Sequence, residues 1–332
     1  MIGKAMSTIC IAAALGGVAL VTPALAQTKV TIVTFAGATN LPVWVARERG
    51  FFAKEGLDVT QEITRGSTPA MRGLMQGKYQ FGSSALDNTI AIAEGQGDVK
   101  FDNFDLVAIL GVHSGMNKIV GRPEIKTFRD IKGKAIASDA LNSGYGLVLV
   151  KVLASHGLVA NKDYTAVAVG STPNRVIAMR EGKAVAAVIS PPVHFGLLKQ
   201  GYNLLADATE AIGAYQGSAF VVRRSWAKAN EKTVLAFLRA QIAATDYVFA
   251  NKAGSLQVLR KYVKGGSDAD LEATYTEMVT SKGGLNRRGA MNMEGVKMLL
   301  TLRNELSGSP RKLNDANKYI DLSYYKKAAA GK

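Results

Sequence analysis

The residues of this chain that could take part in chemistry are hydroxyl, amide and glycine residues gathered in short loops. The tetrapeptide Gly-Ser-Thr-Pro occurs twice, at residues 66–69 and 170–173. Serine and threonine cap helices, and proline fits the first helical turn. The start of a helix presents free backbone N–H groups and a partial positive charge, so such loops can bind an anionic group. The pattern therefore predicts recognition of a small anion by several loops.

The two copies of this tetrapeptide also open similar stretches of sequence. In each, a helix-like run ends at Gly-Lys, at Gly77 or Gly182, and an apolar segment then runs into another small-residue loop. The interval from threonine to that glycine differs by one residue between the copies, so the match is approximate. Chance recurrence of common turn residues is the alternative. The shared Gly-Lys end and the strand after it favour an internal repeat and thus a two-lobed protein.

Apolar, strand-like runs alternate with helix-like runs along the chain, which is typical of parallel α/β layers. Strands are expected at residues 30–35, 59–63, 79–81, 106–110, 118–122, 135–138, 164–169, 184–189 and 218–223, and helices at residues 41–49, 70–76, 84–94, 144–155, 174–181 and 231–249. In open sheets of this class, ligands bind beyond the carboxyl ends of the strands, where loops lead into helices.

The candidate ligand-binding residues lie in or beside these loops, or in the segment that joins the two halves of the chain. They are Phe35, Gly37, Thr39, Asn40, Ser67, Ser83, Ser84, Asp87, His113, Asn142, Ser143, Tyr145, Ser171, Thr172, Arg175, Pro191 and Pro192.

Several of these residues have a structural role as the alternative to ligand contact. Ser83, Ser84 and Ser143 can be helix caps, ligand contacts or both. Tyr145 can close over an organic ligand or pack within its lobe. Arg175 is the best candidate for the counter-charge of an anion, with a solvated helix face as the alternative.

Other candidates bear on the chemical class of the ligand. Asp87 fits an anion poorly: near the start of its helix it can favour the helix dipole, and in a cleft it would suit an amine or a hydroxyl. Phe35 and Tyr145 favour an apolar or aromatic body. His113 lies in a glycine-flanked crossing segment that could border the cleft. The set favours a small organic solute with a sulfonate or carboxylate group.

The motifs of common enzyme classes are missing from the sequence. It has no Gly-x-Ser-x-Gly elbow, no Gly-x-x-x-x-Gly-Lys-Ser/Thr phosphate loop and no His-Glu-x-x-His helix. The three histidines, His113, His156 and His194, are far apart in the sequence. We therefore expect a protein that is not an enzyme, with no catalytic residues, no cofactor and no metal site.

The N-terminus predicts export. Residues 1–26 contain one charged side chain, Lys4, an apolar run at residues 9–21 and Ala-Leu-Ala before Gln27. This order is typical of a secretory signal peptide cleaved after Ala26, and the apolar run is shorter than the roughly 20 residues of a membrane span. A retained membrane anchor is the alternative. We expect the mature protein in the periplasm.

Composition narrows the remaining classes. The only cysteine, Cys10, lies in the signal peptide, so the mature chain excludes disulfides, thiolate metal sites and cysteine nucleophiles. The chain has 41 Lys and Arg against 26 Asp and Glu, a net charge of +15. The basic residues are scattered and no nucleic-acid-binding motif occurs, so we expect no nucleic-acid partner. The charge gives some support to an anionic ligand.

Longer segments of the chain resemble a known family. They are residues 41–52 (LPVWVARERGFF), 55–59 (EGLDV) and 128–134 (FRDIKGK), with the Gly-Lys turns after both repeats. In them the chain resembles the substrate-binding proteins of bacterial ABC importers in the nitrate, sulfonate and taurine (SsuA/THI5-like) branch, which includes relatives that bind thiamine-pyrimidine precursors. The resemblance implies an α/β, two-lobed periplasmic binding protein fold of type II. Each lobe would be a mainly parallel sheet flanked by helices, and two crossing strands would join the lobes.

The sequence pattern and the resemblance together divide the chain. The expected parts are a signal peptide (residues 1–26), lobe 1 (residues 27–112 and 223–326), lobe 2 (residues 118–217), two crossings (residues 113–117 and 218–222) and a disordered tail (residues 327–332).

The resemblance also implies a function. A monomer would capture a small organic solute in the cleft by hinge closure and deliver it to the membrane subunits of an ABC permease. Two alternatives keep the fold: a sensor subunit that presents its ligand to a membrane receptor, and an exported enzyme of a pyrimidine-forming or aromatic-forming type. A neighbouring permease or receptor gene would separate the first two, and turnover would identify the third.

Overall fold

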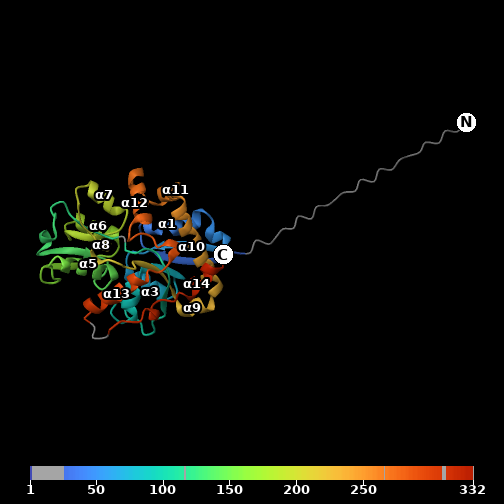
Figure 1. Cartoon of the computed structure of the whole chain (residues 1–332), viewed down its shortest axis with the longest axis horizontal. Coiled ribbons are helices and arrows are strands. Elements are labelled where there is room, and N and C mark those ends of the chain that lie inside the picture. The colour runs from blue at the N-terminus through green and yellow to red at the C-terminus, as the bar shows by residue number, and fades with distance from the viewer. Residues whose placement is uncertain (2–25, 116, 265, 309–311, 332) are drawn as a thin grey trace.

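The computed structural model describes residues 1, 26–115, 117–264, 266–308 and 312–331. These residues form two five-stranded sheets with helices packed around them (Figure 1). The predicted signal peptide, apart from its two end residues, lies outside the described residues. Within the described part, no helix combines the length and the apolar character needed to cross a membrane.

The first sheet, in lobe 1, has the strand order β2-β1-β3-β10-β4. Its strands are β1 (Thr28–Thr34), β2 (Leu57–Ile63), β3 (Phe81–Ala85), β4 (Leu106–Gly111) and β10 (Ser218–Arg223). Strand β1 pairs in parallel with β2 and β3, whereas β10 runs antiparallel to β3 and β4. One strand is therefore reversed in an otherwise parallel sheet.

The second sheet, in lobe 2, repeats this arrangement with the order β7-β6-β8-β5-β9. Its strands are β5 (Lys118–Gly121), β6 (Lys134–Ser138), β7 (Tyr164–Ala168), β8 (Ala186–Ile189) and β9 (Asn203–Asp207). Here β5 is the reversed strand. In each lobe the reversed strand is the one that enters from the other lobe. The predicted two-lobed α/β fold, with mainly parallel sheets, is confirmed.

Helices connect the strands within each lobe and form most of the C-terminal part. They are α1 (Leu41–Glu48), α2 (Phe51–Lys54), α3 (Ser67–Met75), α4 (Leu86–Ala93), α5 (Gly144–Ser155), α6 (Thr172–Arg180), α7 (Val193–Lys199), α8 (Ala208–Ile212), α9 (Arg224–Ala229), α10 (Glu231–Ala250), α11 (Lys252–Tyr262), α12 (Asp268–Thr280), α13 (Met293–Leu306) and α14 (Ser323–Ala330).

Local sequence explains how the first strand and helix are formed and end. Val30 and Val33 of β1 are buried in the core. Pro42 lies in the first turn of α1, where its missing N–H leaves no hydrogen bond unmade. Gly50 follows that helix with a φ of 71°, a left-handed conformation that glycine adopts without steric cost. The loop between β1 and α1, residues 35–40, is thereby placed at the carboxyl end of the sheet.

The two Gly-Ser-Thr-Pro copies occupy equivalent places in the two lobes. The first leads into α3 and then β3, the second leads into α6 and then β8, and both strands are central in their sheets. The two loops also meet, because the Ser171 N–H donates to the Arg65 carbonyl oxygen at 2.9 Å. Gly170 has a φ of +89°, and a Cβ there would lie 2.6 Å from the same oxygen. The repeat therefore brings two matching loops face to face.

Two crossing segments connect the lobes, and a C-terminal loop packs against both. Ser114 of the first segment donates its N–H to the Gly283 carbonyl oxygen at 3.1 Å, and its Oγ donates to the Asn286 Oδ1 at 2.9 Å. Asn286 in turn donates its Nδ2 to the Oε1 of Gln216, in the return segment, at 2.9 Å. How the chain divides into moving parts at these segments stays a prediction.

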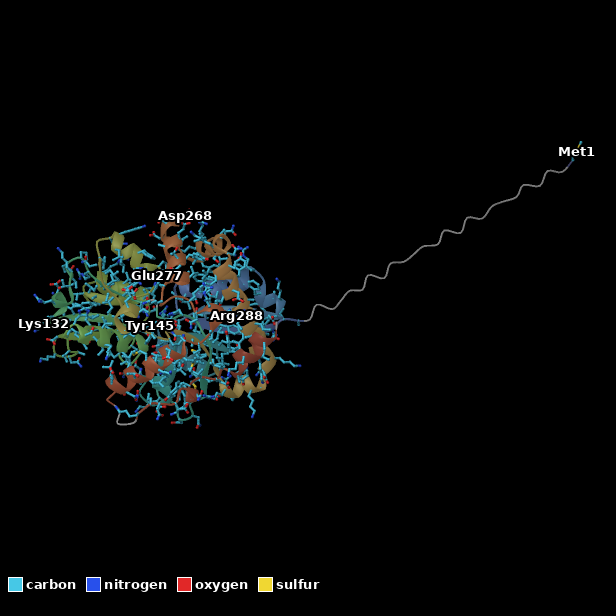
Figure 2. The ribbon with its side chains drawn as sticks, in the orientation of Figure 1. Met1, Lys132, Tyr145, Asp268, Glu277 and Arg288 are labelled. Atoms are coloured by element: carbon cyan, nitrogen blue, oxygen red, sulfur yellow. The ribbon has the colours of Figure 1, made fainter. Side chains whose placement is uncertain are left out.

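Helix α12 of the C-terminal part also contacts lobe 2. The Glu277 carboxylate lies 2.7 Å from the Nζ of Lys118 on β5, and the Asp270 carboxylate lies 2.6 Å from the Nζ of Lys199 on α7. Glu277 and Tyr145 lie near the junction of the two halves, with Lys132 and Arg288 to either side (Figure 2). Ion pairs thus hold the C-terminal part to lobe 2.

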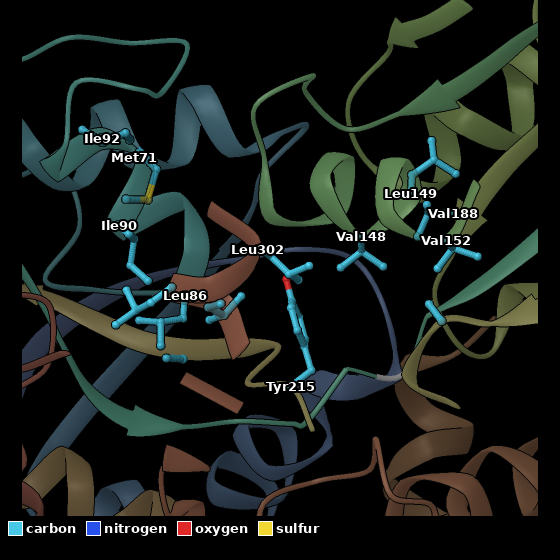
Figure 3. Packing of buried hydrophobic residues seen from close by; sticks show 14 of the residues in the cluster. Met71, Leu86, Ile90, Ile92, Val148, Leu149, Val152, Val188, Tyr215 and Leu302 are labelled. Atoms are coloured by element: carbon cyan, nitrogen blue, oxygen red, sulfur yellow. The ribbon is translucent and has the colours of Figure 1, made fainter. Parts of the chain in front are cut away.

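One hydrophobic cluster runs through the junction of the lobes. It joins Leu86 of α4, Tyr215 of the return segment and Leu302 of α13 to Val148 of α5 and Val188 of β8. Figure 3 shows Tyr215 and Leu302 between the lobe 1 residues on one side and the lobe 2 residues on the other. The lobes are therefore in direct apolar contact in this structure.

The prediction of a disordered C-terminal tail is wrong. Residues 323–330 form helix α14, which packs against α10. Ala328 is buried, and the Nζ of Lys327 lies 2.5 Å from the carboxylate of Glu231. The Ala-rich and Lys-rich sequence resembled a frayed end, but its small side chains fit the surface of α10 and its lysine finds a partner there.

Candidate functional site

A cavity lies between the lobes, at the carboxyl ends of strands from both sheets. We call it the inner cavity. It is lined by Phe35, Ala36, Thr39, Asn40, Ser83, Ala85, Asn88, His113, Asn117, Asp139, Ser143, Tyr145, Thr172, Arg175, Ser190 and Ser218.

The loops predicted to form a site do converge on the inner cavity. Nine of the predicted residues line it, namely Phe35, Thr39, Asn40, Ser83, His113, Ser143, Tyr145, Thr172 and Arg175. Gly37, Pro191 and Pro192 line a second cavity beside it, which we call the outer cavity, and Ser67 and Asn142 line a smaller third one. Ser84, Asp87 and Ser171 line none of these three. Ligand contact by these residues stays a prediction, except for Asp87, whose carboxylate is paired with Arg303.

Arg175 has the most unusual surroundings in the inner cavity. It lies on α6 and is only 2% exposed, so the solvated-face alternative is wrong. Its Nη1 donates to the Gly170 carbonyl oxygen at 2.8 Å, and its Nη2 donates to the Thr172 Oγ1 at 2.7 Å. Its Nε has no hydrogen-bond partner among the described residues. Burial lowers the pKa of this guanidinium, and the Asp139 carboxylate opposes that shift.

Ser143 lines the cavity but also satisfies the local backbone. As the cap of α5, its Oγ accepts from the Gly146 N–H at 3.2 Å and donates to the Ala140 carbonyl oxygen at 2.7 Å. Ser143 is therefore a helix cap, as predicted, and its contact with a ligand stays a prediction.

His113 is a neutral group at physiological pH. It is buried, and burial lowers its pKa to about 4. Its Nδ1 accepts a hydrogen bond from the Gly115 N–H at 3.1 Å. In a neutral ring the proton is then on Nε2, which makes that atom a donor.

Sequence reasoning missed several polar residues of the cavity. Asn88, Asn117, Asp139, Ser190 and Ser218 line it without having been proposed individually. Each is at or beside the end of a strand or in one of the expected loops, so the strand ends were the signal that could have found them.

Hydrogen bonds from these residues bridge the two lobes. The Oδ1 of Asn88 in lobe 1 accepts from the Gly144 N–H in lobe 2 at 3.2 Å. The Oδ1 of Asp139 in lobe 2 accepts from the Ser67 N–H in lobe 1 at 3.4 Å. The inner cavity has a volume of about 40 Å³, which is room for about three water molecules. A larger solute cannot fit entirely within it while these contacts hold.

The structure corrects the prediction that Asp87 is a ligand-binding residue. Its carboxylate is fully buried and forms an ion pair with Arg303 of α13, whose Nε donates to the Oδ1 at 3.1 Å. The Nη2 of Arg303 also donates to the Asn142 carbonyl oxygen of lobe 2 at 2.9 Å. Burial raises the Asp87 pKa and the neighbouring guanidinium opposes this. Asp87 thus fastens α4 to α13 and is not available to a solute.

Among the described residues, no cluster of three or more His, Cys, Asp and Glu side chains is placed to hold a metal ion.

Known proteins resemble this chain in sequence. The family model described as NMT1/THI5 like matches residues 38–254. A 4-amino-5-hydroxymethyl-2-methylpyrimidine phosphate synthase of Uromyces fabae is 25% identical over 65% of this chain, and the chain spans 65% of that protein's length, just under two thirds. YtlA of Bacillus subtilis (strain 168), named provisionally as a binding protein, is 23% identical over 81% of this chain and 80% of its own.

Solved structures resemble it in fold. The periplasmic nitrate-binding protein NrtA from Synechocystis PCC 6803 has a TM-score of 0.76 at 16% identity, covering 92% of this chain and 89% of its own. The alkanesulfonate-binding protein SsuA from Xanthomonas axonopodis pv. citri, bound to MOPS, has a TM-score of 0.71 at 20% identity, covering 89% and 100%. The predicted resemblance and the type II periplasmic binding protein fold are confirmed.

The expectation that the protein is not an enzyme is contradicted by the sequence relatives. Besides the Uromyces protein, relatives from Saccharomyces cerevisiae and Aspergillus parasiticus carry the same synthase name, at 24–25% identity. The missing motifs excluded only the enzyme classes that those motifs define, and a fold shared by binding proteins and synthases does not depend on them.

Proposed function

The chain belongs to the NMT1/THI5-like family, and from this premise we propose that it captures a small organic anion between its lobes and delivers it to a membrane permease. The observation that carries the proposal is that the Arg175 guanidinium is buried and incompletely hydrogen-bonded. A buried cation that is not hydrogen-bonded to a carboxylate is costly, and an anion in the cavity would lower that cost. The solute's carboxylate or sulfonate is placed against the Nε of Arg175, which lacks a partner among the described residues.

Neutral donors complete the proposed anion site. The start of α5 lies at the cavity beside Ser143, and the positive end of a helix dipole favours negative charge, although the Gly144 and Gly146 N–H groups already donate to Asn88 and Ser143. The Nε2 of His113 belongs to a residue that lines the same cavity, whereas the Nδ2 of Asn40 already donates to the carbonyl oxygens of Phe35 and Gly37. Recognition is therefore assigned to the Arg175 guanidinium and several neutral groups, with the Asp139 carboxylate also on the cavity wall.

Closure of the lobes is the proposed mechanism of capture. The inner cavity is lined from both lobes, so a solute gains its full set of contacts only when the lobes meet. Binding then shifts an equilibrium between open and closed forms toward the closed one. The bonds between Asn88 and Gly144 and between Asp139 and Ser67 would form in the same step.

The place of action is proposed from the N-terminal sequence and from the structural neighbours. A leader cleaved after Ala26 would release a monomer into the periplasm. There it would meet the membrane subunits of an ABC permease. NrtA, which shares the fold, is described as periplasmic.

A ligand screen tests the proposal. Protein beginning at Gln27 is unfolded, washed free of carried-over ligand, refolded and examined by thermal shift against sulfonates, carboxylates, nitrate, amino acids and pyrimidines. A ligand present at about a hundred times its Kd stabilises the fold by roughly 2.7 kcal/mol. We expect organic anions to give the largest shifts. Shifts given only by neutral or cationic compounds would contradict an anion site.

A pair of arginine variants tests the residue. Arg175→Gln removes the buried cation, and Arg180→Gln is the matched control, because Arg180 is an exposed arginine on the same helix. We expect isothermal titration calorimetry to show weakened anion binding only for the first variant. Equal affinities in the two variants would move the anion away from Arg175.

Conversion of the bound molecule is a second candidate function. The observation that favours it is the synthase name shared by several relatives. Mass spectrometry of the solute after incubation with the protein separates the two functions. An unchanged solute supports capture and delivery, and a new mass that depends on the protein supports conversion.

A further inference from the structure

The outer cavity opens directly beside the inner one. Four residues line both: Ala36, Asn40, Thr172 and Ser190. The outer cavity has a volume of about 340 Å³, against about 40 Å³ for the inner one. A cavity of roughly 150 Å³ is enough for benzene. The outer cavity is therefore large enough for a single ring or a short alkyl chain, whereas the inner cavity holds only a small polar group.

The lobe 1 wall of the outer cavity contains two firmly held aromatic rings, and Lys264 lies beside them in the lining. Trp44 of α1 stacks on Tyr262 of α11, with ring centroids 4.8 Å apart and planes 6° apart. The Trp44 Nε1 donates to the Gln61 Oε1 at 3.1 Å, and the Tyr262 hydroxyl donates to the Glu48 Oε1 at 2.6 Å. Both polar groups are thus occupied, so these side chains offer apolar ring surface to a bound molecule.

The opposite wall comes from lobe 2 and is also apolar. It consists of Pro173, of Pro191, Pro192 and Val193 at the start of α7, and of the shared residues Thr172 and Ser190. Ile63, at the end of β2, lies on the rim and is 52% exposed, which is high for a large aliphatic residue. A solute between these walls would bury Ile63 and touch both lobes.

We propose that the outer cavity binds the apolar body of the solute whose anionic group is held at Arg175. The ligand class is then an amphiphilic monoanion, a carboxylate or sulfonate bearing a short alkyl chain or one ring. This inference rests on the proposed function. It follows from the shared lining, the difference in volume and the apolar walls, none of which the anion site itself requires.

A homologous series of ligands tests the inference. Refolded protein is titrated calorimetrically with straight-chain carboxylates and sulfonates of two to six carbons, and with benzoate. Burial of each added methylene is expected to tighten Kd about threefold to fourfold. Benzoate is expected to bind more tightly than acetate.

Two isoleucine variants locate the effect. Ile63→Asn places a polar group on the rim, and Ile177→Asn is the matched control, because Ile177 is 51% exposed on α6 and lines neither cavity. Ile63→Asn is expected to weaken the six-carbon ligand several-fold and to leave the two-carbon ligand unchanged. Ile177→Asn is expected to leave both unchanged.

The outcomes separate the inference from the function on which it rests. Anions that bind through Arg175 with a Kd independent of chain length would overturn the outer subsite and leave the anion site standing. A chain-length effect that survives in Ile63→Asn and in Tyr262→Ala would also overturn it. Failure of every anion to bind would overturn both proposals.

Discussion

Arg175 and Arg303 are both almost completely buried, yet their surroundings differ in kind. Arg303 lies against the carboxylate of Asp87, which is buried with it. Arg175 bonds only to neutral oxygen atoms, and its Nε has no partner among the described residues. A buried cation hydrogen-bonded to its own carboxylate is part of the structure, whereas one without a hydrogen-bonded carboxylate is suited to bind an anion from solution.

The largest effect is expected from removing the carboxylate of the paired arginine. Asp87→Ala leaves Arg303 buried and uncompensated, which is expected to lower the free energy of unfolding by about 3–5 kcal/mol. Urea denaturation followed by circular dichroism measures this. The double variant Asp87→Leu/Arg303→Met removes both charges and should recover most of the loss. A loss below about 1 kcal/mol in Asp87→Ala would remove the distinction between the two arginines.

Arg175→Met is expected to behave in the opposite way. It removes a charge that has no carboxylate partner, so the free energy of unfolding without ligand should stay the same or rise. Affinity for organic anions should fall about 10- to 100-fold, because charge-assisted hydrogen bonds are lost. Denaturation and calorimetry on one preparation measure both quantities. If this variant were as unstable as Asp87→Ala, Arg175 would belong to the structure and not to a site.

His113 adds a pH dependence to the site of the unpaired arginine. Its pKa is about 4 in the folded protein and about 6.5 in an unfolded chain. As pH falls below about 7 the unfolded chain takes up the proton first, so stability falls toward pH 4. Between pH 7 and pH 5 this residue should account for a loss of about 1–2 kcal/mol.

The variant His113→Asn isolates this contribution. Asparagine keeps an acceptor near the Gly115 N–H but does not titrate. Urea denaturation at both pH values is expected to give a smaller difference for the variant than for the parent protein. Equal differences would mean that His113 is not held neutral by burial.

The smallest effect is expected at Ser143. Ser143→Ala removes the cap of α5 and should cost about 1 kcal/mol of stability. Anion affinity should change less than about threefold, because the hydroxyl already bonds to Ala140 and Gly146. Thermal denaturation and calorimetry check the two parts. A tenfold loss of affinity would show that the Ser143 hydroxyl contacts the anion, so that Ser143 and Arg175 bind it together.

The sequence predicted the elements and the site loops well, and the partners of individual side chains poorly. Alternation of strands and helices placed the loops containing Asn40, Ser143 and Thr172 at strand ends, where the structure has them. Asp87 was misjudged because its partner, Arg303, is 216 residues away in the chain. Local sequence patterns indicate the periodicity of strands and helices and the caps of helices. An ion pair between distant helices depends instead on how the whole chain packs.

Burial was the second quantity that the sequence did not reveal. Arg175 follows Pro173 in the first turn of α6, a place where a solvated arginine is equally reasonable. A single helix does not encode this burial, because the residues that line the cavity with Arg175 come from both lobes. The helix at residues 323–330 was missed for the same reason, because α10 provides the surface that Ala328 packs on.

The contact between Arg65 and Ser171 has a consequence for size selection. It joins main-chain atoms across the lobes, and Gly170 places no side chain between them. Rotation of side chains therefore cannot bring the lobes any closer. Under the proposed function, an ion too small to fill the space left at that spacing would keep part of its hydration shell and be held weakly. The fixed minimum separation would then disfavour the smallest ions.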